Sequence, residues 1–301
     1  MTQPYYRDEQ VTLLLGDATE RLRTLPNASV DAVITDPPYE IGIAGQAWDS
    51  TGIAYSAALW AECLRVLKPG GHLLSFGATR TYHRMVCAIE DAGLAIRDSI
   101  HWIHGQGYPG GKTQLKPGHE PIVVARRPCH GSEAATIAAH GVGGLHVDGC
   151  RTSTGRWPAN LILTHDMACG AQCATHCPVA ETDRQSGVRT SGTGAVRTKA
   201  GHFMGHGGLG RAGDVQVTYG DSGGASRYYP IFRFESKPSK RDHPTAKPLG
   251  LMRWLVRLVT PPGGTVLDPF TGSGTTLLAA RDEGAHAVGI EQHEPYARIA
   301  K

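Results

Sequence analysis

The chain has few of the features that mark membrane, secreted or strongly charged proteins. Its 301 residues contain no apolar run long enough to cross a bilayer, and the N-terminus lacks the basic-then-apolar pattern of a signal peptide. The net charge is only +3, so total charge alone does not indicate a nucleic-acid partner. Seven cysteines, an odd number, argue against a disulfide framework and for free thiols or metal ligands. We therefore expect a soluble, cytoplasmic protein with no membrane partner.

A short strand followed by two prolines is the first chemical feature. Residues 30–35 form a β-branched run typical of a buried strand, and Asp36, Pro37, Pro38 and Tyr39 follow it. The prolines end the strand and remove two backbone donors, which leaves carbonyl acceptors beside a carboxylate and a phenol ring. Such a group suits an exocyclic amine on a planar base that stacks on Tyr39. An ordinary Pro-Pro turn would fit the same four residues.

A glycine-rich unit near the end of the chain is the second feature. Residues 263–291 read as a strand, a glycine turn, a helix from Thr275 and a strand that ends at Glu291. Gly272 and Gly274 would let the backbone approach a ligand closely, but Leu277 replaces the third glycine of the dinucleotide fingerprint. An acid at the second strand end suits ribose hydroxyls, so a nucleoside cofactor without a required pyrophosphate, such as S-adenosylmethionine, fits.

Strand and helix patterns alternate over much of the remaining chain. We expect strands at 11–15, 72–76, 95–102 and 120–126 and helices at 18–25, 55–67, 81–92 and 249–258. This alternation predicts an α/β fold with a doubly wound, mostly parallel sheet, in which the strands at 95–102 and 120–126 form an antiparallel edge. Ligands of such sheets bind at the carboxyl ends of the strands, where Asp17, Asp36, Asp268 and Glu291 would all lie.

The two features, in this order, resemble the beta group of DNA amino-methyltransferases, the N6-adenine and N4-cytosine family. The resemblance includes residues 15–17, 36–39, 243–248, 268–275 and Glu291. It implies a circularly ordered methyltransferase fold: a catalytic part at 1–127, an inserted, irregular target-recognition segment at 128–242 and a cofactor-binding part at 243–301. It also implies a cytoplasmic, nucleoid-associated enzyme of a bacterium or phage.

The resemblance assigns the site residues by position. Asp36, Pro37, Pro38 and Tyr39 would be catalytic, with Asp36 and the Pro37 carbonyl holding the target amine. The residues expected to bind S-adenosylmethionine are Asp17, Thr245, Lys247, Asp268, Pro269, Phe270, Gly272, Gly274, Thr275 and Glu291. Asp17 would equally serve as a helix N-cap, and Lys247 is expected at the cofactor carboxylate.

The expected substrate is double-stranded DNA, methylated at adenine N6, because similar adenine enzymes usually carry Asp where this chain has Asp36. Cytosine N4 is the alternative within the family, where Ser is common at that position. A catalytically silent nucleic-acid-binding module of this fold, and a methyltransferase for RNA or protein amides, are the competing classes. A homodimer is expected by analogy with similar enzymes, while a partner endonuclease is left open.

The alternation disappears between residues 128 and 240, where the sequence is rich in Gly, Ser, Thr and His. Its second half is basic and contains aromatic residues, which suits contacts to DNA phosphates, although a solvated loop would have the same composition. The basic residues are Arg184, Arg189, Arg197, Lys199, Arg211, Arg227, Arg233, Lys237, Lys240 and Arg241.

Four residues of types that bind metals, one His and three Cys, lie close together in this segment. His165, Cys169, Cys173 and Cys177 recur every four residues, on one face of a helix or in a compact knuckle. Three thiolates and an imidazole form a tetrahedral zinc set, with His176 and Cys150 as substitute ligands. Free thiols are the alternative, because the spacing is not the paired Cys-x-x-Cys pattern.

Overall fold

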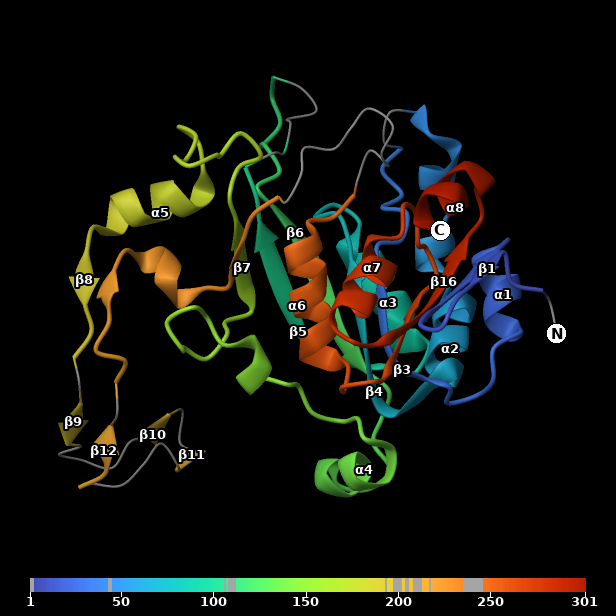
Figure 1. The fold of residues 1–301 in the computed structure, drawn as a ribbon, viewed down its shortest axis with the longest axis horizontal. Helices are drawn as coiled ribbons and strands as arrows, with labels where there is room; N and C mark the ends of the chain where they lie inside the picture. Colours follow the sequence, from blue (N-terminus) through green and yellow to red (C-terminus); the bar gives the residue numbers. More distant parts are fainter. Residues whose placement is uncertain are drawn as a thin grey trace.

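A ten-stranded sheet forms the centre of the computed structural model (Figure 1). The structure describes residues 3–42, 45–105, 107, 112–192, 194–196, 202–203, 206–207, 213–216, 218–234 and 246–301. In spatial order the strands are β1 (Tyr6–Arg7), β2 (Val11–Leu15), β16 (His286–Glu291), β15 (Thr265–Asp268), β3 (Val30–Thr35), β4 (Leu67–Phe76), β6 (His119–Arg126), β5 (Ala95–Ile103), β7 (Leu161–Thr164) and β14 (Ile231–Phe232).

The strand directions confirm the doubly wound, mostly parallel fold. Strands β2, β16, β15, β3 and β4 are parallel, and β6 runs antiparallel between β4 and β5. The last part of the chain supplies β15 and β16, which lie between β2 and β3 from its beginning, so the sheet is circularly ordered as expected.

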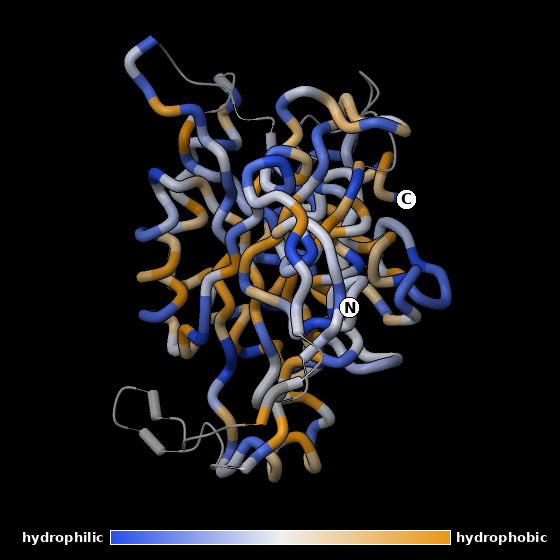
Figure 2. The backbone as a smooth tube through the Cα atoms, turned by 90° about the vertical axis from the view of Figure 1, so that its left-hand side faces the viewer, coloured by the Kyte–Doolittle hydropathy of each residue, from blue (hydrophilic) through white to orange (hydrophobic). Residues whose placement is uncertain are grey.

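Helices cover both faces of the sheet. One apolar cluster joins the sheet to α6 (Leu249–Val259), α7 (Thr275–Asp282) and α8 (Glu294–Ala300). A second cluster joins the other face to α1 (Ala18–Arg23), α2 (Ala57–Val66) and α3 (Tyr82–Asp91). Along β3, Ala32 and Ile34 belong to the first cluster and Val33 to the second. Burial on both faces explains why the strand is mostly apolar, with Asp31 and Thr35 as its buried polar residues. Figure 2 shows hydrophobic segments gathered in the interior of the molecule.

Two expectations about strand positions are wrong. The pair β5–β6 is antiparallel as predicted, but it is not the sheet edge, because β7 pairs with β5 and β14 pairs with β7. In addition, β4 begins at Leu67 directly after α2, not at His72. Its register against β3 shifts between the pairs Val30–Leu67 and Ala32–His72. The left-handed Gly70, at φ +81°, allows this excursion within the strand.

Residues 128–242, which the sequence predicts to be an inserted, irregular segment, contain more regular structure than their composition suggests. Besides β7 and β14 they form α4 (Glu133–His140) and α5 (Pro178–Ser186). Three short antiparallel pairs follow, β8 (Arg189–Thr190) with β13 (Ser222–Gly223), β9 (Ala195–Val196) with β12 (Val215–Gln216), and β10 (His202–Phe203) with β11 (His206–Gly207). Figure 1 shows these ribbons extending from α5 away from the central sheet. Among the described residues, no helix is long and apolar enough to span a membrane.

Candidate active site

A cavity of about 300 Å³ opens at the carboxyl ends of the parallel strands. Its wall comes from the ends of β2, β3, β15 and β16 and from the segment before α6, so it joins the two motifs of the sequence. The predicted site residues that line it are Asp17, Asp36, Pro37, Pro38, Tyr39, Lys247, Asp268, Pro269, Phe270, Gly272, Thr275 and Glu291. A cavity of this size, with acids at several strand ends, is typical of a small-ligand site.

Asp36 presents one occupied and one open carboxylate oxygen. Its Oδ2 accepts a hydrogen bond of 2.5 Å from Lys247 Nζ, while its Oδ1 is buried and has no hydrogen-bond partner among the described residues. Burial raises the pKa of Asp36 despite the neighbouring ammonium. Asp36 lines the cavity, so this buried, unsatisfied acceptor lies beside the space for a ligand, where an N–H group would satisfy it.

Lys247 is engaged differently from the sequence expectation. Its side chain is only 7% exposed, and Nζ lies 2.5 Å from Asp36 Oδ2 and 3.4 Å from Glu120 Oε2. Burial alone would lower the pKa of Lys247, but the two carboxylates raise it. The ammonium also lies 5.2 Å from the centre of the Tyr39 ring. The assignment of Lys247 to the cofactor carboxylate remains a prediction; these contacts favour a role beside Asp36.

Glu120 is a site residue that sequence reasoning missed. Its Oε2 accepts a 2.5 Å hydrogen bond from the Tyr39 hydroxyl, and its Oε1 lies 3.4 Å from His104 Nε2. Burial would raise the pKa of Glu120, but Lys247, His104 and Tyr39 outweigh it and hold the pKa at about 2. Glu120 is thus ionised and fixes the Tyr39 ring. Because β6 is antiparallel, its amino end lies at the same sheet edge as the carboxyl end of β3.

A second missed acid, Asp49, shapes the loop that follows Asp36–Tyr39. Asp49 is fully buried, and its Oδ1 accepts hydrogen bonds from the backbone nitrogens of Tyr39, at 2.6 Å, and Glu40, at 3.0 Å. On the other side, Thr81 Oγ1 donates to the Tyr39 carbonyl at 2.7 Å. The backbone of Tyr39 is therefore held from both directions, so its ring position depends little on the ligand.

These contacts predict a graded series at Tyr39. Tyr39 lines the cavity, so replacing it by Ala removes an aromatic surface and should weaken the binding of a planar ligand there by about 1–3 kcal/mol. Tyr39→Phe keeps the ring and loses only the bond to Glu120, so its effect should be smaller than that of Tyr39→Ala. Tyr82→Phe, which loses a 3.0 Å hydroxyl bond to Ser99 outside the main cavity, is the matched control. Equal damage from Phe and Ala at position 39 would make the hydroxyl, not the ring, the important group.

The other half of the cavity contains a carboxylate that supports the glycine loop. Glu291 ends β16 and accepts hydrogen bonds from Gly272 N at 2.8 Å and His293 N at 2.7 Å. Burial raises its pKa, although these backbone donors oppose the shift. Gly272 has φ +53°, a conformation that favours glycine. Each carboxylate oxygen retains a further lone pair, so Glu291 can still accept from a diol.

Asp268 connects the two central strands below this loop. Its Oδ1 accepts hydrogen bonds from Thr35 Oγ1 at 2.7 Å and from Phe270 N at 3.0 Å. Burial raises the pKa of Asp268 to about 6, with Thr276, Thr35 and Phe270 acting in the opposite direction. Asp268 therefore ties the end of β3, which carries Asp36, to the end of β15, which carries the glycine loop.

Three other cofactor expectations differ in outcome. Asp17 is the N-cap of α1, since its Oδ1 accepts from Glu20 N at 3.0 Å. It also lines the cavity, and its contact with a cofactor remains a prediction. Gly274, at φ +88°, is not among the cavity-lining residues; an added Cβ would lie 2.8 Å from Ala300 Cα, so packing against α8 explains this glycine. Thr245 lies outside the described residues.

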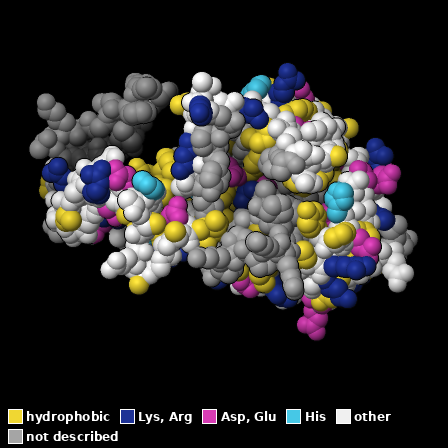
Figure 3. Space-filling view, turned by 90° about the horizontal axis from the view of Figure 1, so that it is seen from above, with side chains coloured by type: hydrophobic (Ala, Val, Ile, Leu, Met, Phe, Trp, Pro, Cys, Tyr) yellow, Lys and Arg dark blue, Asp and Glu magenta, His cyan; other side chains and the backbone are white. Residues whose placement is uncertain are grey.

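Acidic side chains neutralise part of the positive charge in the basic stretch between residues 184 and 241, as far as the structure describes it. Arg184 pairs with Glu181, and the buried Arg227 lies 3.5 Å from Asp221, whereas Arg189 and Arg233 are exposed. Arg197, Lys199, Arg211, Lys237, Lys240 and Arg241 lie outside the described residues. In the view of Figure 3, basic and acidic side chains are interspersed over the described surface. The arginines at 184 and 227 thus have structural partners, and DNA contact by this segment remains a prediction.

Comparison with known proteins identifies the family. A family model described as DNA methylase, of the N6/N4 methyltransferases, matches residues 30–301. The chain belongs to this family. The type II methyltransferase M.HinfI of Haemophilus influenzae is 21% identical over 310 residues, covering 96% of this chain and 67% of that protein. The type II methyltransferase M2.LlaDCHI of Lactococcus lactis subsp. cremoris is 22% identical, covering 100% of this chain and 91% of its own.

Solved structures share the fold of this DNA methylase. The M1.HpyAVI–SAM complex aligns with a TM-score of 0.52 at 19% identity, covering 97% of both chains. The cytosine-N4-specific PvuII DNA methyltransferase aligns with a TM-score of 0.57 at 15% identity, covering 99% of this chain and 88% of its own. The methyltransferase fold predicted from the sequence is therefore confirmed.

Proposed function

We propose that this methylase transfers a methyl group from S-adenosylmethionine to the N6 amino group of adenine in double-stranded DNA. The observation that carries the proposal is the buried, unsatisfied Oδ1 of Asp36, a residue that lines one cavity together with the glycine loop and Glu291. An N–H acceptor and a candidate ribose site thus lie in one cavity, as transfer between a nucleoside cofactor and an amine requires.

The residues on the glycine-loop side fit the cofactor. Glu291 can accept from ribose hydroxyls, and Gly272 brings its backbone to the cavity without a side chain. Phe270 and Pro269 provide apolar wall beside them, as a nucleoside base requires. S-adenosylmethionine, when bound, supplies a methyl group on a sulfonium, which is already a good leaving group. The chain's own contribution is then positioning.

The catalytic side acts on the amine. Asp36 Oδ1 accepts one N–H of the target amine and the Pro37 carbonyl accepts the other, which favours a pyramidal nitrogen and frees its lone pair. Lys247 keeps Oδ2 occupied, so the carboxylate presents its open oxygen. Asp36 is also placed to take the released proton. Tyr39 stacks on the flipped base, with its ring held by Glu120.

The Asp36–Lys247 pair predicts a specific pH dependence. A raised pKa means that Asp36 is ionised only above that value, so activity should fall as the pH drops through it. Lys247→Met removes a neighbouring positive charge, raises the pKa further and should move the acid limb of kcat to higher pH. Lys68→Met, which breaks the 2.7 Å pair with Asp31 on the same strand, is the control and should leave the profile unchanged. A Lys247→Met enzyme with a lower rate and an unshifted profile would contradict this role.

The target base is tested by product analysis. Protein, DNA and S-adenosylmethionine with a labelled methyl group are incubated, and digested nucleosides are separated by mass. We expect N6-methyladenine; the carboxylate at Asp36 supports this choice over cytosine. N4-methylcytosine would establish the alternative within the family, and label recovered in RNA or protein would overturn the DNA assignment. Residues 128–242 are proposed as the target-recognition segment. A homodimer is also proposed, by analogy with similar enzymes, and measurement of the molar mass in solution tests it.

A further inference from the structure

A compact group of metal-binding side chains lies away from the active site, at the end of β7. The imidazole nitrogen of His165 and the sulfurs of Cys169, Cys173 and Cys177 all lie within 4.8 Å of one another. We propose that these four residues hold one structural zinc ion that anchors the inserted segment to the sheet. The neighbouring candidates are excluded: Cys150 is buried beside Trp254, and His176 is exposed outside the cluster.

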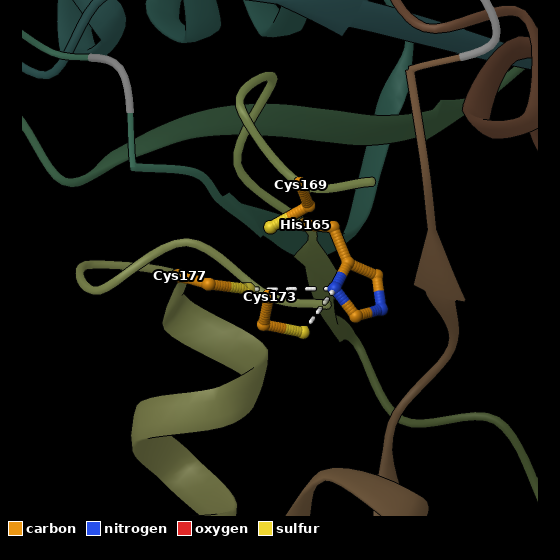
Figure 4. Close-up of side chains that lie close together, drawn as sticks. All are labelled: His165, Cys169, Cys173 and Cys177. Carbon is orange, nitrogen blue, oxygen red and sulfur yellow. Dashed lines mark hydrogen bonds between the residues drawn. The ribbon is translucent and has the colours of Figure 1, made fainter. Parts of the chain in front are cut away.

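The geometry at His165 points to a cation. Both Cys173 Sγ and Cys177 Sγ lie 3.4 Å from the same atom, Nδ1 (Figure 4). A neutral imidazole nitrogen has either one lone pair or one N–H, so it can satisfy one of these sulfurs but not both. In a tetrahedral zinc site, bonds of about 2.3 Å to sulfur and 2.0–2.1 Å to nitrogen place each sulfur about 3.5 Å from the nitrogen. Both distances agree with that spacing.

The local fold brings the ligands together as a knuckle, not as a helix face. His165 follows β7 directly and is fixed by its backbone bond to the Phe232 carbonyl of β14, at 2.9 Å. Asp166 then turns the chain, accepting from Ala168 N at 2.8 Å, and Ala174 N donates to Cys169 Sγ at 3.2 Å. Cys177 is the N-cap of α5, with Pro178 at the first helical position. The helical alternative for this spacing is therefore not realised.

The ligand set indicates a structural ion. Four protein ligands close a tetrahedral site, whereas catalytic zinc sites keep a position open for water or substrate. Three strands separate β7 from β3, so the cluster is about four strand spacings, or roughly 19 Å, from the strand that carries Asp36. Zinc binding would release the thiol protons and leave the methyl-transfer cavity unaltered.

The position of the cluster shows what the ion would stabilise. The apolar core of this region is small: only Leu163, Cys177 and Val179 are buried in it, and a few partly buried side chains pack against them. Yet α5 supports the base of the extended ribbons, since Asp183 accepts hydrogen bonds from Ser226 N at 2.8 Å and Ser226 Oγ at 2.9 Å. A zinc ion that joins β7 to α5 would add binding free energy to the stability of this region, which its small apolar core leaves low.

The test uses the full chain purified without a histidine tag and without added metal. Elemental analysis should show about one zinc per chain, and titration of Cys residues with a mercurial should release it to a colorimetric chelator. Substitution by Co²⁺ should give the absorption bands of tetrahedral cobalt with thiolate ligands. Cys173→Ser should lose the zinc, whereas Cys87→Ser, an exposed cysteine on α3, should retain it.

A measurement of cofactor binding shows whether the zinc proposal and the proposed function fail independently. Calorimetric affinity for S-adenosylmethionine should be the same with and without zinc, because no cluster residue lines the cavity. The number of zinc ions per chain is measured on the wild-type protein. The test therefore does not depend on whether Cys173→Ser folds. Metal-free wild-type protein, a disulfide revealed by thiol counting under denaturing conditions, or zinc retained equally in Cys169→Ser and Cys173→Ser would each overturn the proposal.

Discussion

Asp36→Asn should lower the rate of methyl transfer by about 10³-fold or more while S-adenosylmethionine still binds. Asparagine has the shape of the aspartate but only one oxygen. Lys247 Nζ lies 2.5 Å from Oδ2 and cannot accept a hydrogen bond, so it would draw that single oxygen toward itself. The amide NH₂ would then face the target amine, donor against donor. The loss should therefore approach that of Asp36→Ala, although Asn is nearly isosteric.

Two measurements make this expectation specific. Single-turnover rates with labelled cofactor report the chemistry, and calorimetry reports cofactor affinity, which depends on the Gly272 and Glu291 side of the cavity. Asp91→Asn, at the end of α3, is the control for a neutralised acid on the surface. If Asp36→Asn retained most of the rate, the open Oδ1 would not be the amine acceptor. An equal loss of cofactor affinity in folded protein would place Asp36 on the cofactor instead.

Local patterns in the sequence were enough to predict the centre of the sheet. Strand β3 and the β15–α7–β16 unit have apolar runs, glycine turns and acids at their ends, all within a few residues. Parallel strands then place Asp36, Asp268 and Glu291 at one edge without further information. The positions of these acids at the sheet edge could be predicted because each acid directly follows its strand in the sequence.

Glu120 shows why the remainder of the site could not be predicted. It lies 81 residues from Tyr39 in sequence, and it reaches the site because β6 runs antiparallel between β4 and β5. The sequence contains only a single acid before an apolar run, which would suit any exposed strand end. The contact between Lys247 and Asp36 could not be predicted for the same reason, because 211 residues separate the two in sequence.

Strands β7 and β14 were missed because they are short. They contain four and two residues, in a segment of low apolar content, and pairing with β5 extends the sheet through them. Their burial depends on neighbours that the local pattern does not contain. The spacing of His165 and the three cysteines is evident in the sequence, but the choice between a helix face and a knuckle depends on the turn at Asp166.

Gly272→Val should reduce the affinity for S-adenosylmethionine by about 100-fold or more, which corresponds to about 2.8 kcal/mol. Gly272 has φ +53°, a region that a β-branched residue adopts only at a cost. Relaxing to a permitted conformation would turn its N–H away from Glu291 Oε2, now 2.8 Å distant, and leave a buried carboxylate short of a donor. The valine side chain would also stand on a loop that lines the cavity, where the cofactor must approach. The substitution therefore strains the backbone, leaves Glu291 without one of its donors and narrows the space for the ligand. All three effects weaken cofactor binding.

Gly284→Val separates strain from ligand approach. Gly284 has φ +72°, follows α7 in the same unit, has open space around its Cα and does not line the cavity. Its substitution should lower the melting temperature through the same backbone strain and leave calorimetric cofactor affinity nearly unchanged. The difference in affinity between the two variants then measures what Gly272 contributes at the ligand itself. Equal affinities in two folded variants would mean that the loop does not approach the cofactor, and the nucleoside site would have to be sought at another part of the cavity.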